Sequence, residues 1–255
     1  MSLINRIGRG GTGGRGLFGG GKLSVSYLNI IEYVTIAITG NVTDFGDLSA
    51  ARDLLAGCSS STRGIFGGGS IGNSVNTIEY VTIATTGNVT DFGDLSAARA
   101  LLAGCSSTVR GLFCGGYETS NRTDTIEYVT IATTGNVTDF GNLAYSRMLI
   151  AAGSSGTRAV LSGGDNGSRT NTIEYVTIAT AGNATDFGDL SADRTHLAGC
   201  SSLVRALIGG GYETSEVNKI EYVTIATAGN ATHFGDLSAA RDQLASCSDC
   251  HGGLS

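Results

Sequence analysis

The tripeptide Ile-Glu-Tyr recurs five times along the chain, and this repetition constrains the fold more than any other feature of the sequence. Its glutamates are Glu32, Glu79, Glu127, Glu174 and Glu221, so each unit is 47 or 48 residues long. A unit of that length suits the four strands of a propeller blade and is too long for one turn of a leucine-rich or hexapeptide solenoid. The sequence therefore predicts an all-β fold, a five-bladed β-propeller with four antiparallel strands per blade.

The unit 99–146 shows where the strands of a blade are expected. Short segments rich in β-branched and aromatic residues alternate with glycine-rich breaks, and helical periodicity is absent. A Thr-Gly-Asn sequence between the last two segments is typical of a hairpin turn. The four expected strands, A to D, are Arg99–Cys105, Arg110–Phe113, Thr125–Ala132 and Val137–Phe140.

The two ends of the chain carry complementary parts of one unit. The N-terminal part starts with a B-type sequence at Arg15, and the C-terminal part ends with an A-type sequence from Arg241 to Cys247. We expect that A strand to pair with the N-terminal B strand, because a closed ring leaves no open sheet edge. The expected single domain over 1–255 then contains units at about 52–98, 99–146, 147–193 and 194–240, and a shared blade of 15–51 plus 241–248.

The units resemble those of kelch-type propellers over nearly the whole chain. The match consists of an arginine before strand A, a double glycine after strand B such as Gly115-Gly116, and a tyrosine in strand C such as Tyr128. Kelch units carry a tryptophan in strand D, where this chain has phenylalanines such as Phe140. The repeat wording, IEYVTIATTGN followed by TDFGDLSAAR, also resembles repeats in tail-associated and other virion proteins of marine bacteriophages.

Ten of the fourteen arginines form two periodic sets. One set precedes strand A: Arg52, Arg99, Arg147, Arg194 and Arg241. The other opens strand B: Arg15, Arg63, Arg110, Arg158 and Arg205. Because acids recur with the same period, we interpret both sets as structural rings of ion pairs between blades, in preference to a fivefold anion site.

The cysteines are interpreted as reduced packing residues. Four of the six, including Cys58, occupy one repeat position, where the remaining unit has Gly153, and no histidine recurs beside them. The sequence Cys247-Ser-Asp-Cys250-His251 matches the pattern of c-type haem attachment, but Cys247 is the repeat cysteine; a metal clip or a labile disulfide there stays an open alternative. We expect no cofactor and no metal.

Charge and composition disfavour several classes of partner. The net charge is −6 with only two lysines, Lys22 and Lys219, which disfavours nucleic acid. We see no signal peptide and no apolar run of membrane-spanning length. The three histidines are not repeated and most acids recur in all units, so we do not expect an enzyme.

The loops between strands B and C vary most between units, and strand order places them on one face with the connections between blades. The candidate partner-binding residues on these loops are Tyr117, Glu118, Arg122, Asp165, Arg169, Tyr212 and Glu213. We expect a non-catalytic structural or binding module that engages a protein or a cell surface through this face. The phage resemblance implies a virion location and assembly into a larger particle; the alternative location is cytoplasmic. A carbohydrate-binding propeller is the alternative function, with a five-bladed glycosidase-type enzyme ranked below it.

Overall fold

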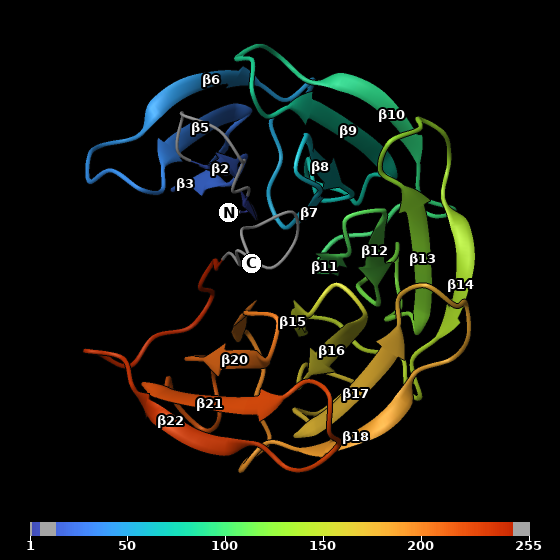
Figure 1. Cartoon of the computed structure of the whole chain (residues 1–255), viewed down its shortest axis with the longest axis vertical. Coiled ribbons are helices and arrows are strands. Elements are labelled where there is room, and N and C mark those ends of the chain that lie inside the picture. Colours follow the sequence, from blue (N-terminus) through green and yellow to red (C-terminus); the bar gives the residue numbers. More distant parts are fainter. Residues whose placement is uncertain (1, 6–13, 247–255) are drawn as a thin grey trace.

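The chain folds into five four-stranded antiparallel sheets arranged as the blades of a propeller (Figure 1). The computed structural model describes residues 2–5 and 14–246, in which all regular secondary structure is β. No helix that could cross a membrane occurs in this part of the chain. The predicted five-bladed β-propeller fold is therefore confirmed.

Each blade runs from an inner strand beside the central axis to an outer strand. Blade 1 contains β1 (Ser2–Asn5), β2 (Arg15–Gly19), β5 (Ile30–Thr35) and β6 (Thr43–Asp47). Blade 2 contains β7 (Ala56–Ser59), β8 (Arg63–Gly67), β9 (Thr77–Thr82) and β10 (Thr90–Asp94). Blade 3 contains β11 (Ala103–Ser106), β12 (Arg110–Cys114), β13 (Thr125–Thr130) and β14 (Thr138–Asn142).

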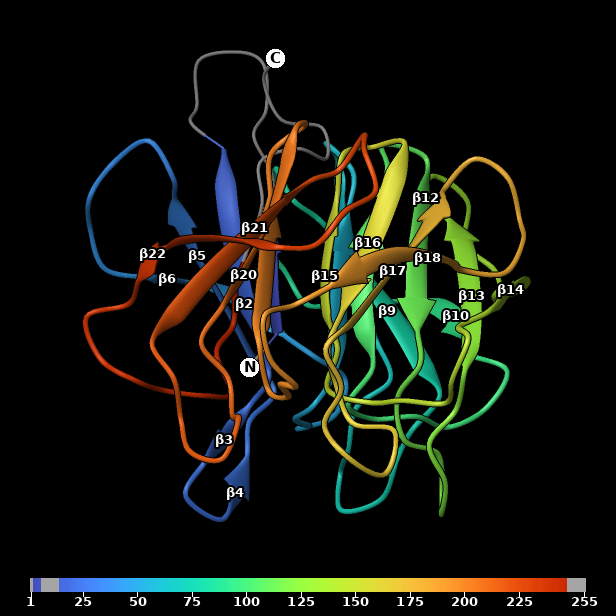
Figure 2. The same ribbon diagram turned by 90° about the horizontal axis from the view of Figure 1, so that it is seen from below.

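The last two blades repeat this order. Blade 4 contains β15 (Ala151–Ser154), β16 (Arg158–Ser162), β17 (Thr172–Thr177) and β18 (Thr185–Asp189). Blade 5 contains β19 (Ala198–Ser201), β20 (Arg205–Gly209), β21 (Lys219–Thr224) and β22 (Thr232–Asp236). A small hairpin of β3 (Lys22–Leu23) and β4 (Ser26–Tyr27) projects from one face of the ring (Figure 2).

The inner strands start later than the sequence predicts. In blade 3 the strand begins at Ala103 and not at Arg99, because Leu101 has a φ of +59° and cannot continue an extended strand. The other strands of this blade match their predicted positions to within two residues. The four residues from Arg99 to Leu102 instead form the approach to the inner strand.

Each blade has a bulge in its outer strand, and in blades 1 to 4 this bulge builds the contact with the next blade. In blade 3 the register between β13 and β14 shifts around Phe140, whose side chain is buried and meets Tyr128 edge-to-face at 6.0 Å between ring centroids. The next residue, Gly141, has a φ of +138°, and a Cβ atom there would lie 2.6 Å from the carbonyl oxygen of Gly182 in blade 4. Only glycine allows the backbones of neighbouring blades to approach this closely.

Four of the five arginines predicted before the inner strands form buried ion pairs that link consecutive blades, whereas Arg241 is exposed and makes none among the described residues. Arg52 contacts Glu79 at 2.7 Å, and the other three pairs are Arg99–Glu127, Arg147–Glu174 and Arg194–Glu221. The backbone of Arg99 bonds to Val75 and Gly69 in blade 2, whereas its guanidinium bonds to Glu127 and to the carbonyl oxygens of Gly115 and Thr125 in blade 3. Each of these arginines therefore ties the connection leaving one blade to the core of the next.

The ion-pair interpretation was wrong for the second set of arginines. Within the described residues, none of Arg15, Arg63, Arg110, Arg158 and Arg205 makes an ion pair. Arg110 instead lies 4.3 Å from the ring centroid of Tyr128 in its own blade and donates a hydrogen bond to the carbonyl oxygen of Ile178 in the next blade. A tyrosine face and a backbone carbonyl satisfy this guanidinium, so it needs no carboxylate.

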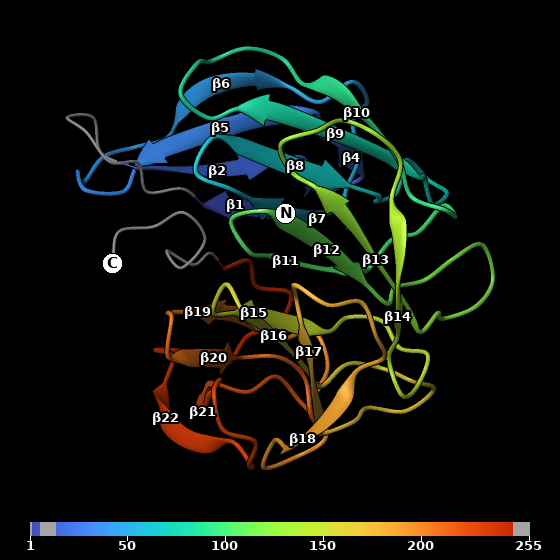
Figure 3. The same cartoon turned by 45° about the vertical axis from the view of Figure 1, so that its right-hand side comes forward.

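The predicted closure of the ring was also wrong. The inner strand of blade 1 is β1, which pairs with β2 from Ser2 opposite Gly19 to Asn5 opposite Gly16 (Figure 3). Because β1 occupies the hydrogen-bonding edge of β2, the C-terminal A-type segment has no strand edge there. Its described part, 241–246, forms no strand, and Ser246 Oγ donates a hydrogen bond of 2.6 Å to the carbonyl oxygen of Gly199 in blade 5.

The cysteines of the inner half of the blades form no disulfides and lie in tight packing. Cys58, Cys105 and Cys114 are buried and Cys200 is partly exposed. Burial raises the pKa of Cys58 to about 12, and the charge of Cys114 adds to the effect. The Cys247, Cys250 and His251 cluster lies outside the described residues.

We expect the buried ion pairs to be essential for stability. Replacing Glu127 by alanine leaves the buried Arg99 without its counter-charge and should lower the free energy of unfolding by about 3–5 kcal/mol, measured by urea denaturation. Glu216→Ala, which removes an exposed carboxylate, is the control and should change the free energy by less than about 0.5 kcal/mol. Equal losses in the two variants would contradict this role.

The raised pKa of Cys58 predicts an inert thiol in the folded protein. At pH 8.5, iodoacetamide should alkylate Cys200 at least tenfold faster than Cys58, followed by peptide mass spectrometry, because the thiolate is the reactive form. Stability should also fall as the pH rises from about 9 towards 12, since the unfolded thiol ionises first. Rapid native-state labelling of Cys58 would be inconsistent with its burial.

Candidate functional site

The variable loops surround one mouth of the central channel. The residue after each double glycine forms a β-bridge with the residue that follows the buried arginine: Asp53 with Ser70, Ala100 with Tyr117, Met148 with Asp165, and Thr195 with Tyr212. The approach to each inner strand and the loop from the second to the third strand are therefore held side by side. This places the channel mouth and the predicted loop residues on the same face, here called the loop face.

The double glycines are required for this arrangement. Gly115 has a φ of +59°, and a Cβ atom there would lie 2.4 Å from the carbonyl oxygen of Arg147. The next glycine, Gly116, donates its backbone N–H to the same oxygen at 2.9 Å. The start of each loop is thus pressed against the connection that leaves its own blade, which fixes the position of the loop.

One residue per repeat lines the channel mouth in a left-handed backbone conformation. This mouth ring consists of Leu54, Leu101, Leu149, His196 and Gln243, with φ values between +53° and +59°. The conformation is unfavourable for residues with a Cβ atom. It is held by backbone hydrogen bonds around the mouth, from Leu101 N to Leu54 O, from Leu149 N to Leu101 O and from Gln243 N to His196 O, each 3.0–3.1 Å long.

The mouth ring encloses a hollow of about 380 Å³. Three leucines of the ring line one part of its wall, whereas His196, Gln243 and the exposed Lys22 give another part polar character. Two buried atoms of lining residues, Asp53 Oδ1 and His196 Nδ1, have no hydrogen-bond partner in the described part of the chain. An unpaired buried polar atom is costly, so each of these atoms would be stabilised by a hydrogen bond.

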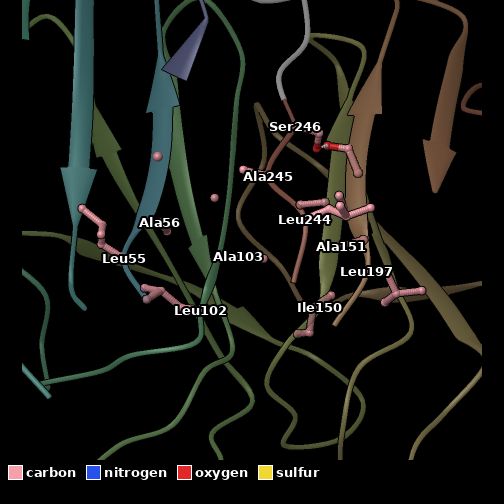
Figure 4. A pocket seen from close by; sticks show the side chains of 15 residues that line it. Leu55, Ala56, Leu102, Ala103, Ile150, Ala151, Leu197, Leu244, Ala245 and Ser246 are labelled. Atoms are coloured by element: carbon pink, nitrogen blue, oxygen red, sulfur yellow. Dashed lines mark hydrogen bonds between the residues drawn. The ribbon is translucent and has the colours of Figure 1, made fainter. Parts of the chain in front are cut away.

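Below the mouth, the channel is narrow and lined by small residues. Figure 4 shows Ala56, Ala103, Ala151 and Ala245 along this wall, with the larger Leu102 towards the mouth. The lower space measures about 140 Å³ and shares Leu55, Leu102, Ile150, Leu197 and Leu244 with the mouth. A ligand of more than a few atoms therefore fits the mouth better than the lower channel.

The predicted loop residues form two contacts across blade junctions and one within a blade. Arg122 of blade 3 forms an ion pair of 2.9 Å with Asp165 of blade 4. Arg169 of blade 4 lies 5.6 Å from the ring centroid of Tyr212 of blade 5. Glu213 pairs with Lys219 within blade 5 at 3.3 Å.

These contacts give most of the predicted residues a structural role in the rim of the mouth. Tyr117 also receives a hydrogen bond on its carbonyl oxygen from Ser74 Oγ of blade 2, and Glu118 next to it is half-buried. One face of the Tyr212 ring is covered by Arg169, which leaves less of this tyrosine for stacking on a sugar. The predicted residues thus form a linked rim, and the hollow inside it is the more open binding element.

Sequence reasoning missed the mouth ring. Its members lie two positions after the buried arginines, where the otherwise similar units have leucine three times, then histidine and glutamine. That variation inside a repeated segment is the signal that marks the position. By contrast, the arginine rings do not line the hollow, which is formed by residues of the approach to each inner strand and by Lys22.

Comparisons with known proteins add no family to this geometry. No protein-family model matches the chain, and a search of curated proteins found no match. Within the described residues, no group of three or more histidine, cysteine, aspartate or glutamate side chains is arranged to hold a metal ion.

The left-handed mouth ring predicts an unusual order of variant stabilities. Leu54 is exposed, so Leu54→Ala keeps the unfavourable backbone conformation whereas Leu54→Gly relieves it. We expect the glycine variant to be more stable than the alanine variant by about 1 kcal/mol in urea denaturation. The same pair of changes at Leu203, exposed and without a positive φ, should show the opposite order.

Proposed function

We propose that the protein is a non-catalytic binding module that engages a protein partner through the loop face. The observation that carries this proposal is the mouth hollow, which combines a leucine-lined wall with two lining residues, Asp53 and His196, that each have an unpartnered buried polar atom. Binding sites of this kind are concave and mostly apolar, with a few polar groups that fix orientation. The surrounding loops supply residues that differ from blade to blade.

The chemistry of the hollow suits a protruding group of a partner. Its volume of about 380 Å³ accommodates a large side chain or a short turn, and the leucines of the mouth ring would bury its apolar part. Asp53 Oδ1 can accept a hydrogen bond, and His196 Nδ1 can accept or donate one. A partner that inserts an apolar side chain with a polar end satisfies both requirements.

Binding without catalysis is supported by the residues of the hollow. None of the residues that line it is a serine, a threonine or a cysteine, so a hydroxyl or thiol nucleophile beside His196 is lacking in this part of the chain. Asp53 and His196 belong to blades on different parts of the ring and do not bond to one another in the structure. Nucleophilic catalysis requires such groups to be adjacent.

We extend the proposal to a tail-associated or other virion protein, on the basis of the resemblance of the repeats to those of phage proteins. A structural subunit of a particle should form a defined assembly larger than the 25.9 kDa chain. Light scattering of the purified protein with and without reductant measures this directly. If the protein is a monomer at all concentrations, with and without reductant, it is not a structural subunit of a particle. Only the proposal of a binding module would then stand.

A selection for peptide ligands tests the proposed binding face. A library of disulfide-constrained peptides would be panned on the immobilised protein, and the affinity of the selected peptides would be measured by calorimetry. Leu101→Asp, which places a charge in the mouth ring, should weaken binding at least tenfold. Val109→Asp, an equal change at an exposed site between the first and second strands on the opposite face, is the matched control and should leave the affinity unchanged.

Two results would overturn the proposal. One is that selected peptides bind Leu101→Asp as tightly as the original protein, because the hollow would then not be the binding site. The other is glycan-array binding that disappears in Tyr117→Ala and Tyr212→Ala, because that result would identify a carbohydrate-binding propeller.

A further inference from the structure

Blade 5 and blade 1 are neighbours in the ring whose facing surfaces are not packed together. Figure 1 shows β21 and β22 on one side of this seam and β5 and β6 on the other. The other four junctions between consecutive blades all repeat one set of contacts.

The junction between blades 4 and 5 illustrates the repeated set. Phe187 in the outer strand of blade 4 is 2% exposed. Its carbonyl oxygen accepts a hydrogen bond from Gly229 N of blade 5 at 2.7 Å, and Asp189 N donates to Asn230 Oδ1 at 3.1 Å. The second-strand arginine, Arg158, donates to the carbonyl oxygen of Ile225 at 3.2 Å.

The residues for a fifth junction are all present in the sequence at the seam. On blade 5, Phe234 and Arg205 take the places of Phe187 and Arg158. On blade 1, Ile36, Gly40 and Asn41 take the places of Ile225, Gly229 and Asn230.

The solvent exposure of two apolar side chains shows that the surfaces on both sides of the seam correspond to surfaces that are buried at the other junctions. Phe234 is 52% exposed, whereas its four equivalents are each 2% exposed. Ile36 is 43% exposed, whereas its equivalents Ile83, Ile131, Ile178 and Ile225 are at most 1% exposed. The seam therefore leaves Phe234 of blade 5 and Ile36 of blade 1 exposed to solvent, although the equivalent side chains are buried at the other four junctions.

The backbone of the fifth arginine of this set, Arg241, already has the hydrogen bonds of its buried equivalents. The backbone of Arg241 accepts a hydrogen bond from Gly211 N at 2.9 Å and donates one to Val217 O at 3.2 Å, as Arg194 does with Gly164 and Thr170. Its side chain is exposed. The glutamate at the equivalent place in the following blade is Glu32 of blade 1, which makes no ion pair in the described structure.

We propose that these two surfaces are the halves of a fifth junction, which blade 5 makes with blade 1 of the same chain. In this closed state Phe234 packs against Ile36, the 40–42 turn bonds to the edge of β22, and Arg241 pairs with Glu32. A partner within the same chain is favoured because covalent connection keeps its effective concentration high. The inference does not depend on the proposed function.

An engineered disulfide tests the closed junction. In the formed junction, the variant pair Asp189→Cys with Asn230→Cys replaces two residues joined by a hydrogen bond and serves as the control for crosslinking geometry. The seam pair is Asp236→Cys with Asn41→Cys. Both proteins would be oxidised under the same mild conditions, and disulfides would be mapped by peptide mass spectrometry. We expect the seam pair to crosslink within one chain to at least half the yield of the control pair.

A double-mutant cycle gives an independent measurement. Glu32→Gln and Arg241→Gln should each lower the melting temperature, and the double variant should lose less than the sum of the two. A control pair that crosslinks while the seam pair stays reduced would overturn the proposal, as would strictly additive effects of Glu32→Gln and Arg241→Gln. A seam disulfide found only between two chains would also overturn it, because the partner would then be a second copy.

Discussion

The buried arginine–glutamate pair is the interaction on which the rest of the structure depends. Burial lowers the pKa of Arg147, and the carboxylate of Glu174 offsets part of this effect, so each charge needs the other. The same guanidinium bonds to the carbonyl oxygens of Gly163 and Thr172, and Glu174 accepts a further bond from Ala144 N. One pair therefore positions an inner-strand approach, a double glycine and a third strand at once.

In this framework, the residues at the blade junctions must be similar in every unit, whereas other residues can differ between units. The residues at the blade junctions satisfy one another and recur in nearly every unit, whereas the mouth ring and the loop rim contribute only one or a few residues per blade. Because the backbone of the mouth ring is held by hydrogen bonds around the channel, His196 and Gln243 replace leucines without a change in backbone conformation. Chemical differences are thereby concentrated on the loop face.

The repeat length and strand order could be predicted from the sequence because each strand carries its own local signals. The closure could not be predicted, because Ser2–Asn5 does not resemble a repeat unit and yet occupies the edge of β2 that we expected for the C-terminal A-type segment. The second set of arginines was misassigned because their partners, a tyrosine ring and a backbone carbonyl oxygen, are uncharged. Such partners cannot be recognised from the pattern of charges in the sequence. The mouth ring was missed because its left-handed conformation arises from contacts between blades.

The approach of Gly141 to the backbone of Gly182 has a consequence for how such a chain can change in evolution. The contact involves main-chain atoms, and it joins each of the first four blades to the following one: Gly46 with Gly87, Gly93 with Gly135, Gly141 with Gly182 and Gly188 with Gly229. Recombination that inserts or deletes one whole unit therefore creates the same contact again, without a new side-chain match at the join. The number of blades can therefore change by one at a time during evolution. The curvature of the ring must then adjust to the new number of blades.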